Sequence, residues 1–227
     1  MDFDLKEWIS RIKSLKDIPR FIAFEGIEGS GKTTQAKLLG SFLKKCGFNV
    51  KVVRDPGFTP LGEKIRKILK SEVNIDSVSE LFLFLAARRQ LVVDVVRPAL
   101  RKGIVVITDR FTNSTLAYQG RGRGLMPETL PMLCYIATGG VEPELTFVLD
   151  IDPEKGLQRA KKRSESEKSK EDRFEAQDIQ FHRRIREFYA ELAENSENVF
   201  IIDSSQDIYS VFADVVSKLY EFSKEKF

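Results

Sequence analysis

The sequence predicts an α/β fold of three layers, in which helices flank a five-stranded parallel sheet. Five short apolar runs alternate with stretches of helical pattern, and each run is almost continuously apolar. Such runs are typical of parallel strands covered on both faces, and their alternation with helices predicts a doubly wound sheet with right-handed crossovers. The predicted strands are Phe21–Glu25, Asn49–Val53, Ile104–Thr108, Leu145–Asp150 and Val199–Asp203.

Capping residues mark the helix boundaries between these strands. The stretch Lys32–Cys46 ends before Gly47, which suits a left-handed C-terminal cap. The apolar stretch Ser77–Leu100 opens with serine and has glutamate three residues later, which is the pattern of a capping box with serine as the N-cap. Asp152 followed by Pro153 predicts another helix start, because proline fits the first helical position.

Two segments fall outside this regular pattern. The segment Arg159–Arg173 has no core-forming residue after Ala160, so its composition predicts a solvated loop. Its place after the fourth strand and its helix also fits a mobile lid over a ligand, at about residues 159–175. Residues 21–227 are predicted to form a single domain, which their number allows. Residues 1–20 are predicted to add an amphipathic helix with an apolar stripe of Leu5, Trp8, Ile9, Ile12 and Leu15.

Composition and charge exclude several classes of protein. The 37 basic and 34 acidic residues give a net charge of +3, which provides no strong field for nucleic acid or an anionic membrane. No apolar run reaches the ~18 residues that a membrane span needs, and the N-terminus lacks the regions of a signal peptide. Cys46 and Cys134 have no CxxC motif or histidine cluster near them, which argues against a zinc site or disulfide framework and favours a reducing cytosol. We expect a cytoplasmic protein with neither a nucleic-acid nor a membrane partner.

A glycine-rich loop after the first predicted strand carries the strongest chemical signal. Gly26–Thr33 reads GIEGSGKT and fills every required position of the GxxxxGK[ST] pattern, between a predicted strand and a predicted helix. Its glycines allow backbone N–H groups and the helix N-terminus to surround phosphate oxygens. Lys32 is expected to reach the β- and γ-phosphates, and the Thr33 hydroxyl to bind Mg²⁺. The loop predicts a bound nucleotide without deciding the reaction.

A second polar set follows the third predicted strand. Asp109, Arg110 and Phe111 lie where ligands bind in open α/β sheets, and an arginine there can hold a phosphate through two hydrogen bonds. On these residues alone, an exposed Asp–Arg ion pair is the alternative. The NKxD tetrapeptide with which GTPases read guanine is absent from the sequence. Glu25, at the end of the first strand, is a candidate partner for a buried backbone or side-chain group.

Five stretches together resemble the thymidylate kinase family. They read FEGIEGSGKTTQ (24–35), RDPGFTPLGEKIR (54–66), ELFLFLAARR (80–89), DRFTNSTLAYQGRGRGL (109–125) and EDRFE (171–175). The resemblance spans about residues 21–189, and a P-loop of this kind together with DRF and AYQG is not expected in other families. It implies the three-layer P-loop kinase fold with a short lid, and Mg²⁺-dependent transfer of the γ-phosphoryl group of ATP to dTMP, giving dTDP and ADP for dTTP synthesis. It also implies a homodimer formed through helices around Leu81–Val96 and Pro127–Ala137.

The resemblance implies roles for individual residues as well. Phe84 matches the aromatic residue that stacks on thymine, although its apolar helix alone would make it a core residue, and Arg88 matches the arginine that binds the base edge. The implied ATP-binding residues are Gly26, Ile27, Glu28, Gly29, Ser30, Gly31, Lys32, Thr33 and Thr34. The implied dTMP-binding residues are Glu28, Asp55, Pro56, Phe84, Arg88, Arg110, Ser114, Thr115, Tyr118 and Gln119. The implied catalytic residues are Lys32, Arg110, Asp109 and Arg173, and the candidate Mg²⁺ ligands are Thr33, Glu28 and Asp109.

The sequence departs from the family pattern in two places. The segment Arg54–Phe58 reads RDPGF where the family has REPGG, so the acid is one carbon shorter and the last glycine is replaced by a bulky residue. The early lid, KKRSESEKSK (161–170), lacks the usual arginine–glycine pattern. Because the P-loop contains no arginine, the cation for the transition state is expected from the lid. Arg173 aligns with the family there, and Arg163 is the alternative.

Three alternatives stay open at this point. Another nucleoside-monophosphate kinase, for example one that acts on UMP or CMP, would share the P-loop and differ in its base pocket. A regulatory nucleotide switch would bind nucleotide without an acceptor. A degenerate homologue would have lost its chemistry, which the intact Lys32, Thr33, Asp109 and Arg110 argue against.

Overall fold

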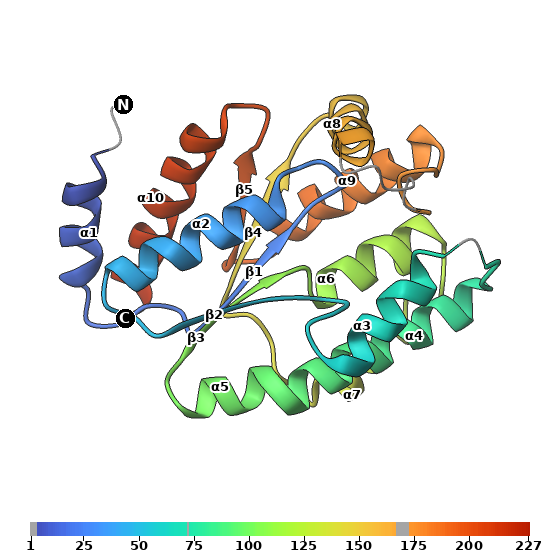
Figure 1. Cartoon of the computed structure of the whole chain (residues 1–227), viewed down its shortest axis with the longest axis horizontal. Coiled ribbons are helices and arrows are strands. Elements are labelled where there is room, and N and C mark those ends of the chain that lie inside the picture. Colours follow the sequence, from blue (N-terminus) through green and yellow to red (C-terminus); the bar gives the residue numbers. More distant parts are fainter. Residues whose placement is uncertain (1–3, 72, 167–172) are drawn as a thin grey trace.

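A five-stranded parallel sheet forms the centre of the molecule, in the order β2-β3-β1-β4-β5 (Figure 1). The computed structural model describes residues 4–71, 73–166 and 173–227. The predicted fold class and all five predicted strands are confirmed, with β2 and β3 displaced by one residue from the prediction. The strands are β1 Phe21–Glu25, β2 Val50–Arg54, β3 Val105–Asp109, β4 Leu145–Asp150 and β5 Val199–Asp203.

Helices connect the strands and cover both faces of the sheet (Figure 1). Two of the helical segments, η1 and η2, have the wider turns of a π-helix and continue directly from an α-helix. The described helices are α1 Leu5–Lys13, α2 Lys32–Lys45, α3 Pro60–Leu69, α4 Ser77–Leu91, η1 Val92–Val96, α5 Arg97–Arg101, α6 Thr112–Thr115, η2 Leu116–Gly122, α7 Leu130–Thr138, α8 Pro153–Ser166, α9 Ile179–Glu194 and α10 Ile208–Lys226.

The two faces of the sheet bury separate apolar clusters. On one face, strand residues such as Phe24 pack with Leu39 of α2 and Leu219 of α10. On the other face, Phe21 packs with Val92 of η1, and Val148 packs with residues of η2 and α9. Because both faces are covered, the central strand β1 is buried along its whole length. This burial explains why the strands are apolar without alternation.

One helix start, the continuity of one helix and one loop differ from the sequence predictions. The N-cap of α4 is Asp76 and not Ser77, because the Asp76 carboxylate accepts from the backbone N–H groups of the first turn. The predicted helix 77–100 is divided into α4, η1 and α5. The segment that composition predicted as a loop from Arg159 is helical through Ser166, as the end of α8. Its polar residues are compatible with a helix that is exposed over most of its surface.

The N-terminal helix α1 packs against the C-terminal helix α10. Ile12 is fully buried in the same cluster as α10 residues, and the Trp8 ring meets Tyr220 edge-to-face at 5.9 Å. Leu5, which was predicted on the packed stripe, is 38% exposed. Among the described helices, none combines the length and the apolar composition that crossing a bilayer requires.

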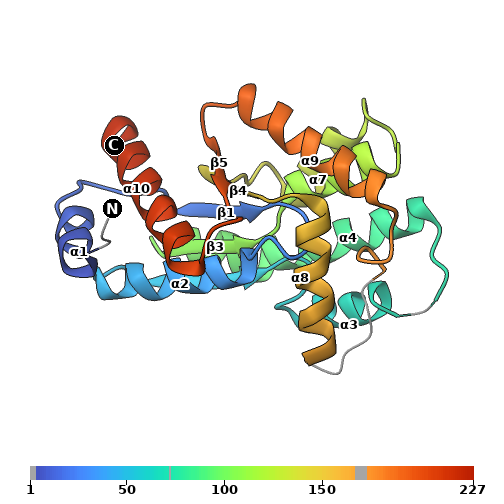
Figure 2. The same cartoon turned by 90° about the horizontal axis from the view of Figure 1, so that it is seen from above.

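The carboxyl ends of β1 and β3 lie side by side and open toward one edge of the sheet. Phe24 is paired with Asp109, and the backbone N–H of Arg110 continues the ladder by donating to Phe24 O at 2.9 Å. Helix α8 runs across this end of the sheet, beyond the tip of β1 (Figure 2). The fold therefore brings the P-loop, the residues after β3 and α8 to one place.

Candidate active site

The P-loop joins β1 to α2 in a conformation that only glycine adopts readily at several positions. Gly26, Gly29 and Gly31 have φ values of 132°, 70° and 93°. A Cβ atom on Gly29 would also collide with the carbonyl of Gly156 in α8. The glycine pattern thus serves both the left-handed backbone and the close approach of α8 to the loop.

Lys32 is folded back onto its own loop. Its Nζ donates to Ile27 O at 2.6 Å and to Ser30 Oγ at 3.3 Å, and the side chain is largely buried. Burial, together with the neighbouring Arg110 guanidinium, lowers the pKa of Lys32 to about 7. The carboxylates of Glu28 and Asp109 only partly oppose this shift. A bound polyphosphate would add negative charge beside Lys32 and would raise the pKa of the ammonium group again.

Two of the three predicted metal ligands meet at the carboxyl edge of the sheet. The Thr33 hydroxyl at the start of α2 donates to Asp109 Oδ2 at the end of β3. Both are hard oxygen donors of the kind that Mg²⁺ prefers. Glu28, the third candidate, faces a different set of partners around Arg110.

Arg110 is the centre of a charged cluster beside the P-loop. It has a φ of 70°, which turns the chain sharply after β3. Its Nη2 donates to Glu28 Oε1 at 2.7 Å and to Tyr118 Oη at 3.0 Å, while Nη1 donates to Gly26 O at 3.2 Å and to Ser114 Oγ at 3.1 Å. Although burial alone would raise it, the pKa of Glu28 is lowered to about 2, chiefly by the Arg110 guanidinium. The alternative of an exposed surface pair for Arg110 is wrong.

Glu25 holds the turn that presents Arg110. Its Oε1 accepts from the backbone N–H groups of Phe111 and Ser114 at 2.8 and 3.2 Å. Its Oε2 accepts from Ser114 Oγ at 2.5 Å and from Tyr189 Oη at 2.9 Å. Burial raises the pKa of this carboxyl. The structural interpretation of Glu25 is confirmed, and Tyr189 of α9 is a partner that no sequence pattern indicated.

Helix α4 carries two of the predicted dTMP-binding side chains, Phe84 and Arg88, four residues apart, and Arg88 contacts the segment after β3. Arg88 is 1% exposed and donates to Asp55 Oδ2 at 2.5 Å, to Thr115 Oγ1 at 2.7 Å and to Phe111 O at 3.0 Å. One turn earlier, the half-buried ring of Phe84 lies 5.9 Å from the ring of Phe174. The Phe174 ring also lies 5.5 Å from the ring of Tyr118 of η2. We use the name α4–η2 slot for the group made by Phe84 and Arg88 of α4, Thr115 of α6 and Gln119 of η2.

The loop that departs from the family pattern keeps a left-handed residue at the changed position. Phe58 has a φ of 67° and is 44% exposed, and its N–H donates to Glu63 Oε1 at 2.7 Å. The Asp55–Pro56 peptide bond is cis. The bulky side chain is therefore accommodated by pointing outward, and the shorter acid, Asp55, still reaches Arg88.

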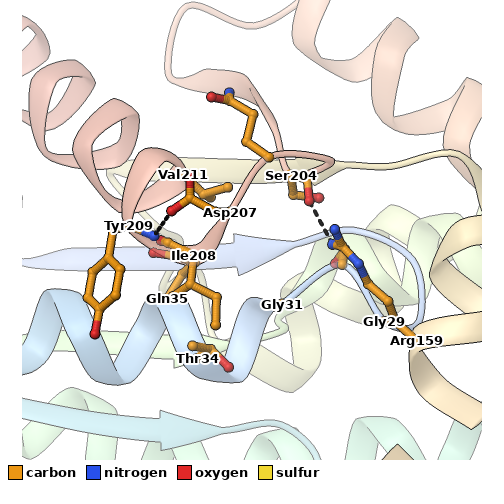
Figure 3. A pocket seen from close by; sticks show the side chains of 12 residues that line it. Gly29, Gly31, Thr34, Gln35, Arg159, Ser204, Asp207, Ile208, Tyr209 and Val211 are labelled. Atoms are coloured by element: carbon orange, nitrogen blue, oxygen red, sulfur yellow. Dashed lines mark hydrogen bonds between the residues drawn. The ribbon is translucent and has the colours of Figure 1, made fainter. Parts of the chain in front are cut away.

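A cavity of about 530 Å³ lies on the other side of the P-loop, between α2, α8 and the start of α10 (Figure 3). Arg159 of α8 donates to Ser204 O at 2.7 Å across it, and Gln35 donates to Ile208 O at 2.9 Å. The sequence did not indicate this cavity, because the residues after β5 carry no recognisable pattern. The cavity is lined by Gly29, Ser30, Gly31, Thr34, Gln35, Arg159, Ser204, Gln206, Asp207, Ile208, Tyr209 and Val211.

Comparison with known proteins connects this geometry to a family. The sequence model of the family described as "Thymidylate kinase" matches residues 24–215. The chain belongs to the thymidylate kinase family. A thymidylate kinase from Maridesulfovibrio salexigens is 45% identical over 215 residues, with 91% of this chain and 98% of that protein covered. A thymidylate kinase from Caldanaerobacter subterraneus subsp. tengcongensis is 42% identical over 207 residues, with 90% and 97% covered.

A solved structure supports the same conclusion. The crystal structure of thymidylate kinase from Ehrlichia chaffeensis matches with a TM-score of 0.72 and 34% sequence identity, and the match covers 88% of this chain and 97% of that chain. The fold and the family resemblance read from the sequence are thus both confirmed.

The two predicted lid arginines, Arg173 and Arg163, have contacts that the sequence did not indicate. Arg173 pairs with Glu80 Oε2 at 3.4 Å and donates to Ile75 O at 3.5 Å, so its described contacts are at the start of α4 and not at the P-loop. Arg163 lies on α8, the helix that touches the P-loop, and donates to Glu175 Oε1 at 2.7 Å. Residues 167–172, including most of the EDR part of the lid motif, lie outside the described residues.

Proposed function

We propose that this protein transfers the γ-phosphoryl group of ATP to dTMP, giving dTDP and ADP, in support of dTTP synthesis. The observation that carries the proposal is the position of Arg110, whose Nη1 is 3.2 Å from the P-loop carbonyl of Gly26. An acceptor phosphate held by Arg110 would lie next to a donor phosphate held by the loop. Membership of the thymidylate kinase family supports the same reaction. With its two cysteines free and buried, the protein suits a reducing cytoplasm.

Phosphoryl transfer mainly needs alignment of the two substrates and neutralisation of charge. Backbone N–H groups of the P-loop would bind the donor phosphates, and Lys32 would exchange Ile27 O for a phosphate oxygen. Glu28 and Tyr118 hold the Arg110 guanidinium in place before the acceptor arrives. The acceptor phosphate is already an anion, so the reaction needs no general base.

Thr33 and Asp109 are the residues that we assign to Mg²⁺. Within the described residues, no group of three or more metal-binding side chains gathers at one point. This fits Mg²⁺, which usually keeps several waters and takes its other ligands from phosphates and one or two side chains. The ion would neutralise charge on the donor phosphates. We assign Glu28 to Arg110 instead of the metal. Chelation of Mg²⁺ should abolish turnover, and added Mg²⁺ should restore it.

The α4–η2 slot is our proposed site for the thymine ring. Phe84 offers a ring face for stacking, which is worth roughly 1–3 kcal/mol per base. Arg88 is already fixed by Asp55 and Thr115, so its guanidinium would meet a base carbonyl without further ordering. On the opposite side of the P-loop, the cavity lined by Arg159 and Tyr209 is large enough for the adenosine part of ATP.

An ADP-release assay with a panel of nucleoside monophosphates tests this proposal. We expect rapid ADP formation with dTMP, measurable activity with dUMP, and poor activity with CMP, UMP and AMP. The methyl group that separates dTMP from dUMP contributes only roughly 1–3 kcal/mol in a fitted pocket. Equal rates with dTMP and AMP, or ADP release that ignores the acceptor, would overturn the proposal in favour of a broader kinase or a nucleotide switch.

Arginine from the lid segment is our proposed source of the transition-state cation. Such an arginine contributes about 10³–10⁵ to turnover in other phosphoryl-transfer systems. Arg173→Ala and Arg163→Ala separate the two candidates. The catalytic one should lose orders of magnitude in kcat with little change in melting temperature or dTMP affinity. Unchanged kcat in both variants would exclude a lid arginine without affecting the assignment of the substrates.

We propose a homodimer that uses α4 and α7. Large apolar side chains are exposed on both helices, with Phe82 at 55% and Ile136 at 62% exposure, and α4 and α7 are in contact with each other. Met132 and Tyr135 of α7 are exposed as well, and exposed apolar surface that is contiguous marks protein–protein interfaces. Ile136→Asp should shift the protein from dimer to monomer in sedimentation equilibrium. A monomeric wild-type protein at micromolar concentration would refute this proposal.

A further inference from the structure

Glu80 is a buried carboxylate that the roles assigned so far do not use. It lies in the first turn of α4 and is 1% exposed. Its Oε1 accepts from Gln119 Nε2 at 3.1 Å and from Arg123 Nε at 3.4 Å. Its Oε2 accepts from Arg123 Nη2 at 3.3 Å and faces Arg173 Nη2 at 3.4 Å. The guanidinium groups of Arg123 and Arg173 therefore compensate the charge of Glu80, and the contact with the Gln119 amide is additional.

The position of this contact relates Glu80 to the α4–η2 slot. Glu80, Phe84 and Arg88 are spaced by four residues and lie along one stripe of α4. The pair Glu80–Gln119 is at one end of this stripe, and the pair Arg88–Thr115 is at the other. Along α4, the contact with Gln119 thus lies one turn before Phe84 and Arg88 lies one turn after it.

The carboxylate determines which side of the Gln119 amide faces it. An ionised carboxylate only accepts hydrogen bonds, whereas an amide has a donor NH₂ group and an acceptor oxygen. The NH₂ group must therefore be turned toward Glu80, and Oε1 must point in another direction. Within the described part of the chain, no donor is hydrogen-bonded to Gln119 Oε1. As far as the described residues extend, Gln119 Oε1 is therefore available as an acceptor at the end of the slot.

A fixed acceptor distinguishes pyrimidines by their hydrogen-bonding edge. Thymine and uracil carry a donor N–H at N3 and a carbonyl at C4, whereas cytosine carries an acceptor at N3 and an amine at C4. An acceptor that faces N3 can accept a hydrogen bond from thymine or uracil, whereas it is repelled by the N3 acceptor of cytosine. We propose that Glu80 is a positioning residue, which orients the Gln119 amide and thereby selects thymine and uracil monophosphates against cytosine monophosphates. This inference rests on the proposed assignment of the slot to the acceptor base.

Glu80→Gln tests the inference, because glutamine can accept or donate and so leaves the Gln119 amide free to turn. We measure kcat and KM for dTMP, dUMP and dCMP. The dTMP to dCMP ratio of kcat/KM should fall by at least roughly ten-fold, which is the range supported by one hydrogen bond, and mainly through KM. The dTMP to dUMP ratio should stay unchanged, since both bases share the N3 edge.

Two further variants separate orientation of the amide from general loss of structure. Arg123→Met removes an ion-pair partner of Glu80 but leaves the carboxylate on Gln119, so it should keep the dTMP to dCMP ratio. Gln119→Leu removes the amide and should lower the ratio, and adding Glu80→Gln to it should produce no further change. If Glu80→Gln alone does not fold, Glu80→Gln with Arg123→Leu removes one of the two guanidinium groups that lose their carboxylate, and it should give the same low ratio.

The outcomes separate this inference from the proposed function. Failure of the wild-type protein to phosphorylate dTMP would refute the proposed function. Normal dTMP activity, with a dTMP to dCMP ratio that Glu80→Gln leaves intact, would overturn only the role of Glu80. An equal fall of the ratio when Glu80→Gln is added to Gln119→Leu would also overturn it, because Glu80 would then act independently of the amide.

Discussion

The buried pair between Arg88 and Asp55 provides the sharpest test of the energetics of the site. Their side chains are 1% and 0% exposed, and the two charged groups are 2.5 Å apart. Asp55→Asn keeps the shape but removes the negative charge, which leaves the buried guanidinium with neutral acceptors alone, among them Thr115 Oγ1 and Phe111 O. Breaking a buried pair in this way costs about 3–5 kcal/mol. For a domain of this size the loss corresponds to a fall in Tm of roughly 6–20 °C.

An exposed pair serves as the matched control. Glu197 and Lys226 also join distant parts of the chain, at 3.0 Å, but their side chains are 88% and 48% exposed. Glu197→Gln should change the free energy of unfolding by less than ~1 kcal/mol. Urea unfolding followed by circular dichroism measures both variants. If Asp55→Asn and Glu197→Gln both change the free energy of unfolding by less than ~1 kcal/mol, the Asp55 carboxylate is not needed to compensate the buried charge of Arg88, and the reasoning is refuted.

Removing both charges of the buried pair gives a second, independent measure. Burial raises the pKa of Asp55 even though Arg88 opposes the shift, which indicates that taking this carboxylate out of water is costly. The double change Asp55→Leu with Arg88→Met should therefore be less destabilising than Asp55→Asn alone. The same double variant should lose dTMP binding, since we propose that Arg88 contacts the base.

Three further predictions concern the P-loop and the loop after β2. Lys32→Ala should abolish phosphoryl transfer while the circular dichroism spectrum stays that of the wild type; near-normal turnover would contradict the P-loop assignment. Phe58→Gly should be more stable than Phe58→Ala by about 1 kcal/mol, because alanine keeps the cost of a left-handed backbone at φ 67° and glycine does not; equal melting temperatures would show that the conformation carries no strain. The pKa of Glu28 is lowered from 4.5 to about 2, so the unfolded chain binds more protons between these values, and the stabilisation is complete above pH 4.5 and lost as the pH falls toward 2. In Glu28→Gln, the free energy of unfolding should therefore depend less on pH between pH 4.5 and 2. If this dependence is unchanged, other carboxylates cause it.

Local patterns in the sequence were sufficient for the sheet and for the phosphate-binding loop. The five strands could be predicted because parallel strands buried on both faces must be apolar at nearly every position. The P-loop could be predicted because its left-handed glycines and its lysine follow one another in eight consecutive residues. The DRF segment after β3 was recognisable for the same reason, and Arg110 does lie beside the P-loop.

Only the tertiary structure shows which charged residues pair with one another. Glu28 could be a metal ligand or a partner for arginine on sequence grounds, and only its 2.7 Å bond to Arg110 favours the second. Arg173 follows an acidic pair in sequence, yet its described ion pair is with Glu80, more than ninety positions away. His182, the single histidine of the chain, is fully buried with Nδ1 3.3 Å from Glu28 Oε2, which its surroundings in sequence did not indicate.

The sequence by itself thus determined the strands, the glycine loop and the family, since each depends on residues close together in the chain or on a pattern shared along most of it. The order of the strands and the packing of the helices decided the rest. They bring Asp55 from the loop after β2 to Arg88 of α4, and Ser204 from the loop after β5 to Arg159 of α8. The partner of each charged residue is therefore set by contacts between segments that are far apart in the sequence. The same contacts determine how much water is excluded around each pair, and the separation of two residues in the sequence does not predict either.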